Sequence, residues 1–156
     1  MNKEMSLAEV LTTAIAREEE AFFFYMDLMD SAKGKNVKDT LQWIANEEFK
    51  HRKFLVDYRN GKHGKNALRM TTVVDYKVAE HLSQPDADKP LKDSEVYLVA
   101  AHRELKSNQF YTGLAQLHSD PEIKNLLLGM ASEELKHKEK MEYLYSNTEF
   151  PQTAGG

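Results

Sequence analysis

Four long stretches of the chain carry apolar residues at spacings of three and four, with polar residues between them. This period is typical of amphipathic α-helices, and none of the four stretches contains a proline. The pattern therefore predicts an all-α protein. The expected helices cover residues about 6–33, 37–59, 94–119 and 122–147.

The connections between these helices are two short turns and one long segment. A short turn makes each helix pair an antiparallel hairpin, whereas residues 60–93 are long enough to cross over along the whole bundle. Within that crossover, residues 71–82 fit either a short helix or an extended strap. We expect a single four-helix domain over residues 1–150 and a flexible tail at 151–156.

Polar residues at the predicted helix starts support these boundaries. Ser6 is followed three residues later by Glu9, as in a capping box. Asp120 precedes Pro121, which suits an N-cap followed by the first helical residue. Asp93 is the expected cap of the third helix.

The second half of the chain repeats the first at an offset of 86 residues, without a gap. Glu18 aligns with Glu104, Tyr25 aligns with Tyr111, and the sequence EEFKH at 47–51 aligns with EELKH at 133–137. Such self-similarity indicates a duplicated helical hairpin. Two copies packed about a pseudo-two-fold axis bring equivalent residues face to face.

Each predicted helix places acidic residues, and in two helices a histidine, within its inward-facing apolar row. The neighbouring residues Glu19, Glu47 and Glu133 lie about 100° off these rows. In both hairpins the inward residues lie 16 and 14 residues from the turn, so they reach the same depth. The residues that converge on this layer are Glu18, Glu48, His51, Glu104, Glu134 and His137.

Four ionised carboxylates in one buried layer need compensating charge, since an isolated buried ion costs several kcal/mol. No Lys or Arg lies on the inward rows to supply it. Two divalent cations would balance the charge, with the two histidines as neutral nitrogen ligands. Such oxygen and imidazole ligands suit iron or manganese, and zinc or cobalt would also bind. A metal-free bundle with protonated carboxyl groups is the alternative; a single Glu-x-x-His alone would indicate only a solvated surface.

Several other residues have simpler interpretations. Tyr25 and Tyr111 fill the core one layer away and can hydrogen-bond to a ligand carboxylate, with a redox role as the lesser alternative. His118 is expected to interact with a helix dipole. Phe22, Phe23 and Phe24 cannot all face one core, so at least one should point outward, which suggests a homo-oligomer and most simply a homodimer. The histidines expected to be exposed are His63, His81 and His102.

Composition narrows the possible functions. The 156 residues have a net charge of -4 and no long basic run, which argues against a nucleic-acid partner. No apolar stretch is long enough for a membrane span and no signal peptide is evident, so we expect a cytoplasmic protein. The absence of cysteine excludes disulfides, thiolate metal sites and cysteine-held iron–sulfur clusters from this chain.

The chain resembles the ferritin-like superfamily, and most closely the rubrerythrin-type di-iron domains, over residues about 10–147. The resemblance rests on AREEEAFFFY and AHRELKSNQFY, which share a Glu-x-x-x-x-x-x-Tyr spacing, and on the two Glu-x-x-His motifs. It implies two iron ions per chain, with manganese or zinc as alternatives, held by the six inward residues. It also implies that Glu48 and Glu134 bridge the two metals.

Two departures from the family pattern affect the expected chemistry. Typical rubrerythrins carry a rubredoxin-like domain with four cysteines, so here electrons must come from an external donor such as a rubredoxin or a reductase. The further glutamate one turn after the third-helix ligand is replaced by Ser107. This puts the family's redox-linked iron movement in doubt.

The resemblance implies an oxidoreductase that reduces peroxide or O2 at a di-iron site, with a role in oxidative stress. A ferroxidase that stores or passes on iron is the first alternative. A metal-stabilised structural or sensory bundle without catalysis is the second.

Overall fold

The computed structural model describes residues 4–64 and 73–151, and these residues are almost entirely helical. The long helices are α1 (Leu7–Leu28), α2 (Lys35–Arg59), α4 (Asp93–Gln116) and α5 (Pro121–Glu149). Two short elements complete the described part: η1 (Met29–Ser31) and α3 (Val78–His81). The prediction of an all-α protein is confirmed, and the described residues contain no strand.

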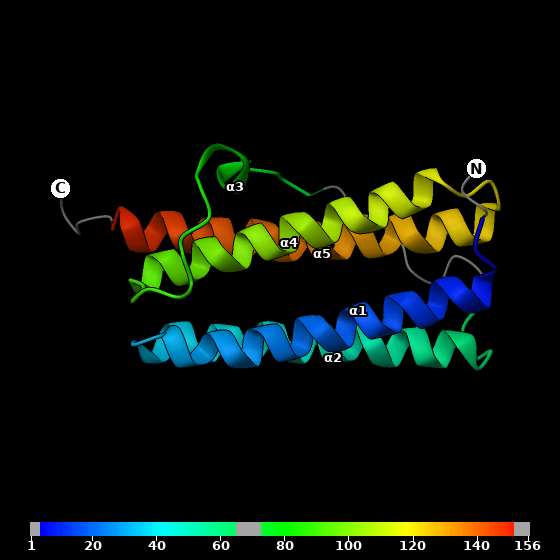
Figure 1. The fold of residues 1–156 in the computed structure, drawn as a ribbon, viewed down its shortest axis with the longest axis horizontal. Coiled ribbons are helices and arrows are strands. Elements are labelled where there is room, and N and C mark those ends of the chain that lie inside the picture. Colours follow the sequence, from blue (N-terminus) through cyan, green and yellow to red (C-terminus); the bar gives the residue numbers. More distant parts are fainter. Residues whose placement is uncertain (1–3, 65–72, 152–156) are drawn as a thin grey trace.

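The four long helices form two antiparallel hairpins that lie side by side in one elongated bundle (Figure 1). Helices α1 and α2 make one hairpin, and α4 and α5 make the other. The chain leaves α2 at one end of the bundle and starts α4 at the opposite end (Figure 1). The connection therefore crosses the bundle lengthwise, as predicted; residues 65–72 and the predicted tail beyond 151 lie outside the described residues.

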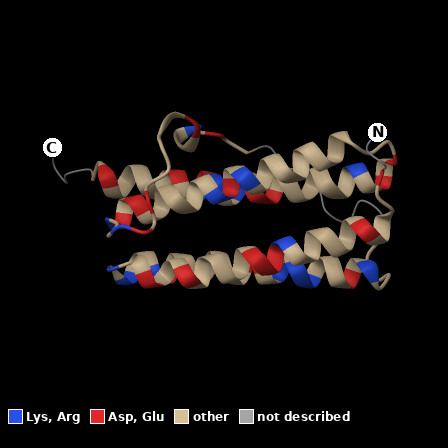
Figure 2. Cartoon of the chain, in the orientation of Figure 1, with Lys and Arg blue, Asp and Glu red and all other residues tan. Residues whose placement is uncertain are grey.

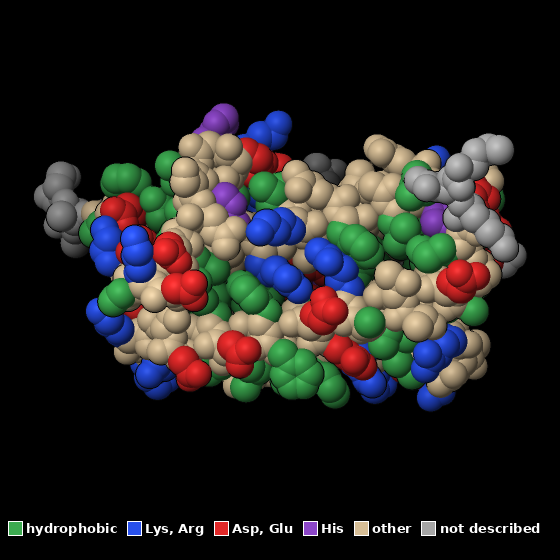
Figure 3. Space-filling model, viewed as in Figure 1, with side chains coloured by type: hydrophobic (Ala, Val, Ile, Leu, Met, Phe, Trp, Pro, Cys, Tyr) green, Lys and Arg blue, Asp and Glu red, His purple; other side chains and the backbone are tan. Residues whose placement is uncertain are grey.

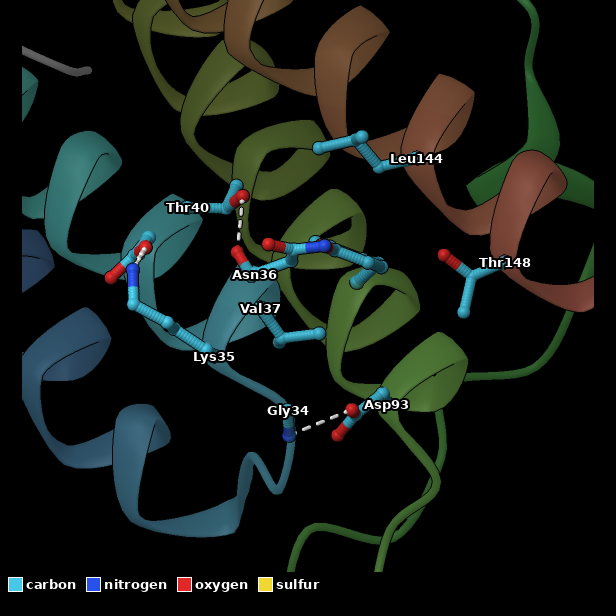
Figure 4. Close-up of a pocket in the computed structure, with 10 residues that line it drawn as sticks. Gly34, Lys35, Asn36, Val37, Thr40, Asp93, Leu144 and Thr148 are labelled. Carbon is cyan, nitrogen blue, oxygen red and sulfur yellow. Dashed lines mark hydrogen bonds and ion pairs between the residues drawn. The ribbon is translucent and has the colours of Figure 1, made fainter.

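Two of the three predicted helix caps are confirmed, and the third helix begins differently from the prediction. Ser6 and Glu9 form a capping box, and Asp120 caps α5 with Pro121 in its first turn. Asp93 is the first residue of α4 rather than its cap. Its carboxylate accepts hydrogen bonds at 2.9 Å from the backbone N–H groups of Lys33 and Gly34 (Figure 4). The start of α4 thereby ties down the turn between α1 and α2.

Apolar side chains fill the bundle on both sides of a polar central layer. One cluster, around Tyr25, Leu41 and Met141, lies toward the α1–α2 turn. The other, around Leu11 and Leu127, lies toward the opposite end. Each fully buried leucine in these clusters contributes about 1.5–3 kcal/mol to folding. The two clusters keep the layer between them away from water.

The crossover is anchored on the α4–α5 hairpin by a fully buried lysine. The ammonium group of Lys138 lies 2.6 Å from Asp75, 2.8 Å from Glu80 and 3.0 Å from Glu142. Glu142 also accepts a hydrogen bond from the backbone N–H of Ala79. In the described part of the predicted strap, residues 73–77 have no regular secondary structure and Val78–His81 form the short helix α3.

The histidines outside the central layer differ partly from expectation. His63 and His81 are exposed, as predicted. His102 was expected to be exposed, but it is half-buried because the crossover lies over it, with its Nε2 2.8 Å from the Leu82 carbonyl oxygen. His118 is buried, and its Nδ1 lies 2.8 Å from the Leu114 carbonyl near the end of α4.

None of the helices among the described residues is both long enough and apolar enough to cross a lipid bilayer. Charged residues occur along the four long helices, with acidic and basic positions close together near the middle of α1 (Figure 2).

Candidate metal centre

The middle of the bundle contains a layer of carboxylates and imidazoles contributed by all four long helices. Helices α1 and α4 each place one glutamate there, and α2 and α5 each place a glutamate and a histidine one turn apart. The four carboxylates are at most 1% exposed. The structure thus brings together all six predicted residues: Glu18, Glu48, His51, Glu104, Glu134 and His137.

These residues form two overlapping groups whose potential ligand atoms lie within 4.8 Å of one another. The first group adds Glu18 and His51 to Glu48 and Glu134, and the second adds Glu104 and His137 to the same pair. Since Glu48 and Glu134 belong to both groups, each could offer one carboxylate oxygen to each of two metals. This arrangement fits two neighbouring ions with shared carboxylates.

The imidazoles approach the carboxylates through their Nδ1 atoms. His137 Nδ1 lies 2.9 Å from Glu48 Oε1, and His51 Nδ1 lies 3.3 Å from Glu134 Oε1. The two rings are nearly parallel, with centroids 5.2 Å apart. Each histidine therefore faces the glutamate of the other hairpin, as the pseudo-two-fold symmetry requires.

Two buried tyrosines orient the remaining carboxylates across the hairpins. The Tyr25 hydroxyl donates a 2.7 Å hydrogen bond to Glu104, and the Tyr111 hydroxyl donates a 2.9 Å hydrogen bond to Glu18. These bonds are equivalent under the 86-residue repeat. They confirm the predicted tyrosine–carboxylate contact and hold one oxygen of each glutamate in place.

Burial and mutual repulsion give the four carboxyl groups different proton affinities. Burial, followed by the charges of neighbouring glutamates, raises the pKa of Glu48 and of Glu134 well above 4.5. Burial also acts to raise the pKa of Glu18, but close polar contacts with Glu48 and His51 outweigh it and bring this pKa to about 2. Burial acts to raise the pKa of Glu104 as well, but close polar contacts with Glu134 and His137 outweigh it and lower this pKa.

His51 is held in a strongly anionic setting. Burial acts to lower the pKa of His51, but contacts with Glu133, Glu134 and Glu18 raise it well above 6.5. Without metal, Glu48, Glu134 and His51 therefore hold their protons to higher pH than free side chains do. Metal ions would replace those protons, since bound carboxylate must be ionised and bound imidazole must present a lone pair.

Several buried polar atoms in this layer have no hydrogen-bond partner. Buried polar atoms are otherwise paired in folded proteins, so such a concentration calls for a ligand. Among the described residues, the cationic partners within 4.0 Å of the four carboxylates are the two histidines alone. Divalent cations thus fit both the charge and the donor atoms. The unpartnered atoms are Glu48 Oε2, Glu104 Oε2, Glu134 Oε1 and His51 Nδ1.

Three neighbours of the layer were not singled out from the sequence. Glu133, although off the inward row, is half-buried and places Oε2 3.8 Å from His51 Nε2. Trp43 packs edge-on against His137, with ring centroids 5.7 Å apart. Lys138 is buried beside His137 under the crossover. Only the adjacent Glu-Glu pair in EELKH offered a signal for Glu133.

Comparison with known protein families agrees with this geometry. The family model described as Rubrerythrin matches residues 9–145. The chain belongs to the rubrerythrin family. The rubrerythrin match confirms the ferritin-like fold expected from the repeated hairpins and the long crossover. No curated protein and no solved structure matches the chain.

Membership of the rubrerythrin family gives the central layer a chemical context. Rubrerythrin domains typically bind iron, and the two carboxylate and histidine groups of this chain could hold metal ions. These 156 residues contain no cysteine, so no rubredoxin-type iron site is part of them.

Proposed function

We propose that the protein is a non-haem di-iron oxidoreductase that reduces peroxide or O2. The observation that carries this proposal is the pair of four-residue groups sharing Glu48 and Glu134. In it, Glu18 and His51 would hold one iron and Glu104 and His137 the other, with Glu48 and Glu134 available to both. Two ferrous ions at these positions supply the two electrons that the reduction needs.

The chain's own residues support this chemistry in three ways. Tyr25 and Tyr111 hold the carboxylates of Glu104 and Glu18 in fixed orientations. The apolar clusters on both sides exclude water, which strengthens every electrostatic contact within the layer. The high pKa values of Glu48 and Glu134 make these carboxyl groups the proton-holding members of the layer when a metal is absent.

Iron handling is the second candidate, and the lack of cysteine favours it because these residues contain no thiolate electron-transfer site. In this role the centre oxidises Fe(II) and passes the iron on. The oxidoreductase role instead requires an external electron donor, such as a rubredoxin or a reductase, for repeated turnover.

Anaerobic addition of hydrogen peroxide to the Fe(II)-loaded protein separates these functions. The proposal expects fast oxidation of two irons per chain, followed by further turnovers once a reductant is supplied. Continued oxidation and uptake of many irons per chain would favour iron handling. No oxidation within minutes would overturn both and leave a metal-stabilised bundle without catalysis.

A further inference from the structure

A surface cavity between α1 and α2 leads to the candidate metal centre. Its volume is about 350 Å³, and at its inner end lies Glu18, one of the six central residues. The larger cavity at the end of the bundle (Figure 4) and a third one beside Tyr143 contain none of the six. The α1–α2 cavity is lined by Glu18, Glu19, Phe22, Phe23, Phe49 and Arg52.

Three phenylalanine rings give this cavity an apolar wall. The Phe22 ring lies 5.3 Å from Phe23 and 5.9 Å from Phe49, measured between centroids. Phe23 is 63% exposed and Phe49 is 51% exposed, so this apolar surface faces solvent rather than the core. Apolar side chains gather over α1 and α2 at the lower edge of the face in Figure 3, between charged side chains.

The internal repeat shows that the corresponding face of the other hairpin is closed. The position of Arg52 is taken there by Lys138, which is fully buried under the crossover, whereas the Arg52 side chain is 36% exposed. The position of Phe22 is taken by Asn108, whose side chain donates a hydrogen bond to the Ala131 carbonyl of α5. The described residues of the crossover thus cover one of two equivalent approaches to the central layer and leave the other, beside Arg52, partly exposed.

The size of the open cavity indicates the size of its ligand. A water molecule occupies about 30 Å³, so hydrogen peroxide or O2 would fill only a small part of it. Cavities of about 300 Å³ and larger are typical of sites that bind organic molecules. The aromatic wall would contact a carbon skeleton, which neither small oxidant has.

The charges of the lining indicate that the ligand is neutral. Arg52 Nε lies 2.7 Å from Glu19 Oε1, so this cation is already paired. Arg52 is the one cation among the described residues that line the cavity, so the lining offers no unpaired positive charge to an anionic ligand. A carboxylate or phosphate ligand would find no free counter-charge there, whereas a neutral ligand needs none.

We infer that this cavity binds the carbon skeleton of a neutral organic hydroperoxide, with its O–O group directed toward Glu18 and the metal centre. The inference rests on the proposed function and specifies its substrate class. Reduction of the hydroperoxide would break its O–O bond and, with two electrons from a bound ferrous pair and two protons, would give one alcohol and one water.

Binding of the unreactive alcohol 2-phenylpropan-2-ol to the full-length, metal-loaded, oxidised protein tests the cavity without any turnover. Calorimetry should show saturable binding, and Phe49→Gln should weaken it about fivefold to tenfold through lost apolar contact. Tyr143→Gln is the matched control, because Tyr143 is 55% exposed and lies outside this cavity. Absent binding, or equal binding by both variants, would overturn the inference.

A kinetic ratio gives the second readout. The rate constant for iron oxidation by cumene hydroperoxide, divided by that for hydrogen peroxide, should fall about fivefold in Phe49→Gln and stay constant in Tyr143→Gln. An unchanged ratio in Phe49→Gln would contradict the inference. If both peroxides still react in that case, the proposed function is unaffected. Alcohol binding without any peroxide reaction would support the cavity as an organic site but overturn the proposed function.

A second copy of the chain is the rival occupant of the same apolar surface. Sedimentation velocity of the wild type and of Phe49→Gln distinguishes a dimer interface from a ligand cavity. A dimer that Phe49→Gln dissociates, together with no alcohol binding by the wild type, would assign the surface to an interface and overturn the inference.

Discussion

The four buried glutamates share one layer, yet each pair has its own surroundings. Glu18 and Glu104 accept hydrogen bonds from tyrosines, and their pKa values are lowered. Glu48 and Glu134 lie between the other carboxylates, and their pKa values are raised. The two pairs therefore divide the work expected of a dinuclear site into fixed terminal ligands and shared, proton-accepting ones.

Replacing a shared glutamate should affect both metals at once. Glu48→Ala removes a carboxylate that belongs to both four-residue groups, so bound metal should fall from about two ions to less than one per chain. Elemental analysis after gel filtration measures this ratio. Glu47→Ala is the control, since Glu47 precedes the same position but is half-exposed and pairs with Lys50. Equal metal content in both variants would refute the proposed ligand set.

The metal-free protein should lose stability as pH rises above neutrality. Glu48, Glu134 and His51 have raised pKa values in the folded state. The stabilising effect of the two glutamates is therefore complete below about pH 4.5, and that of the histidine below about pH 6.5. It is lost as pH rises through the folded-state values. Glu18 acts in the opposite direction, because its effect is lost only as pH falls from 4.5 toward about 2.

Thermal unfolding of chelator-treated and metal-loaded protein at about pH 6 and about pH 8.5 checks this expectation. The melting temperature of the chelator-treated protein should be lower at the higher pH. Metal loading should largely remove the difference, because bound ions take the place of the protons. A chelator-treated protein that gains stability with pH would contradict the assigned directions.

At the scale of elements, the crossover depends on one lysine of α5. Lys138 is fully buried and pairs with Asp75 and Glu80 of the crossover, as well as with Glu142. Removing one member of a buried ionic group leaves the others without a counter-charge. The resulting loss usually exceeds what the intact group contributes.

Lys138→Met should therefore lower the free energy of unfolding by about 2 kcal/mol or more and loosen the crossover. Urea denaturation gives the free energy, and limited proteolysis reports whether residues 73–84 become accessible. Arg52→Met is a matched control at the equivalent repeat position, where the side chain is half-exposed and pairs with Glu19 rather than with a described residue of the crossover. Equal losses in both variants would mean that the crossover gains nothing from the buried lysine.

The helices and the central layer could be predicted from sequence because the signals are local. Helical periodicity marks the inward rows, and the repeat places Glu48 and Glu134, and His51 and His137, at equivalent positions. The functions of Lys138 and Asp93 could not be predicted, since their partners come from segments far away in the chain. His102 was wrongly expected to be exposed for the same reason: the crossover that covers it has no periodic pattern of its own.

At the scale of the whole molecule, the 86-residue repeat gives two nearly equivalent hairpins, and the crossover between them breaks their symmetry. The tyrosine–glutamate bonds obey the symmetry, whereas the described crossover residues Asp75, Ala79 and Glu80 contact α5 of the second hairpin. The predicted homodimer, which the described contacts do not test, stays a prediction.

Symmetry predicts matched effects for the two tyrosines. Tyr25→Phe and Tyr111→Phe each remove one buried hydrogen bond to a carboxylate, so each should lower the free energy of unfolding by about 1–3 kcal/mol. Each should also weaken metal binding about tenfold or more. Metal titration and denaturation of both variants measure these effects, with Tyr143→Phe as an exposed control. A large effect in one variant and none in the other would show that the two halves are not equivalent.

Each hairpin donates a tyrosine hydrogen bond to the glutamate of the other hairpin, and this has a consequence for the origin of the chain. Tyr25 serves the glutamate of the second hairpin, and Tyr111 serves that of the first. A single hairpin already encodes one of each required side chain, so two identical copies meeting about a two-fold axis would assemble the same constellation. The 86-residue repeat is what two such hairpins joined end to end would leave in one chain. A symmetric pair of separate hairpins could not carry a cover on one side alone, whereas a joined chain can.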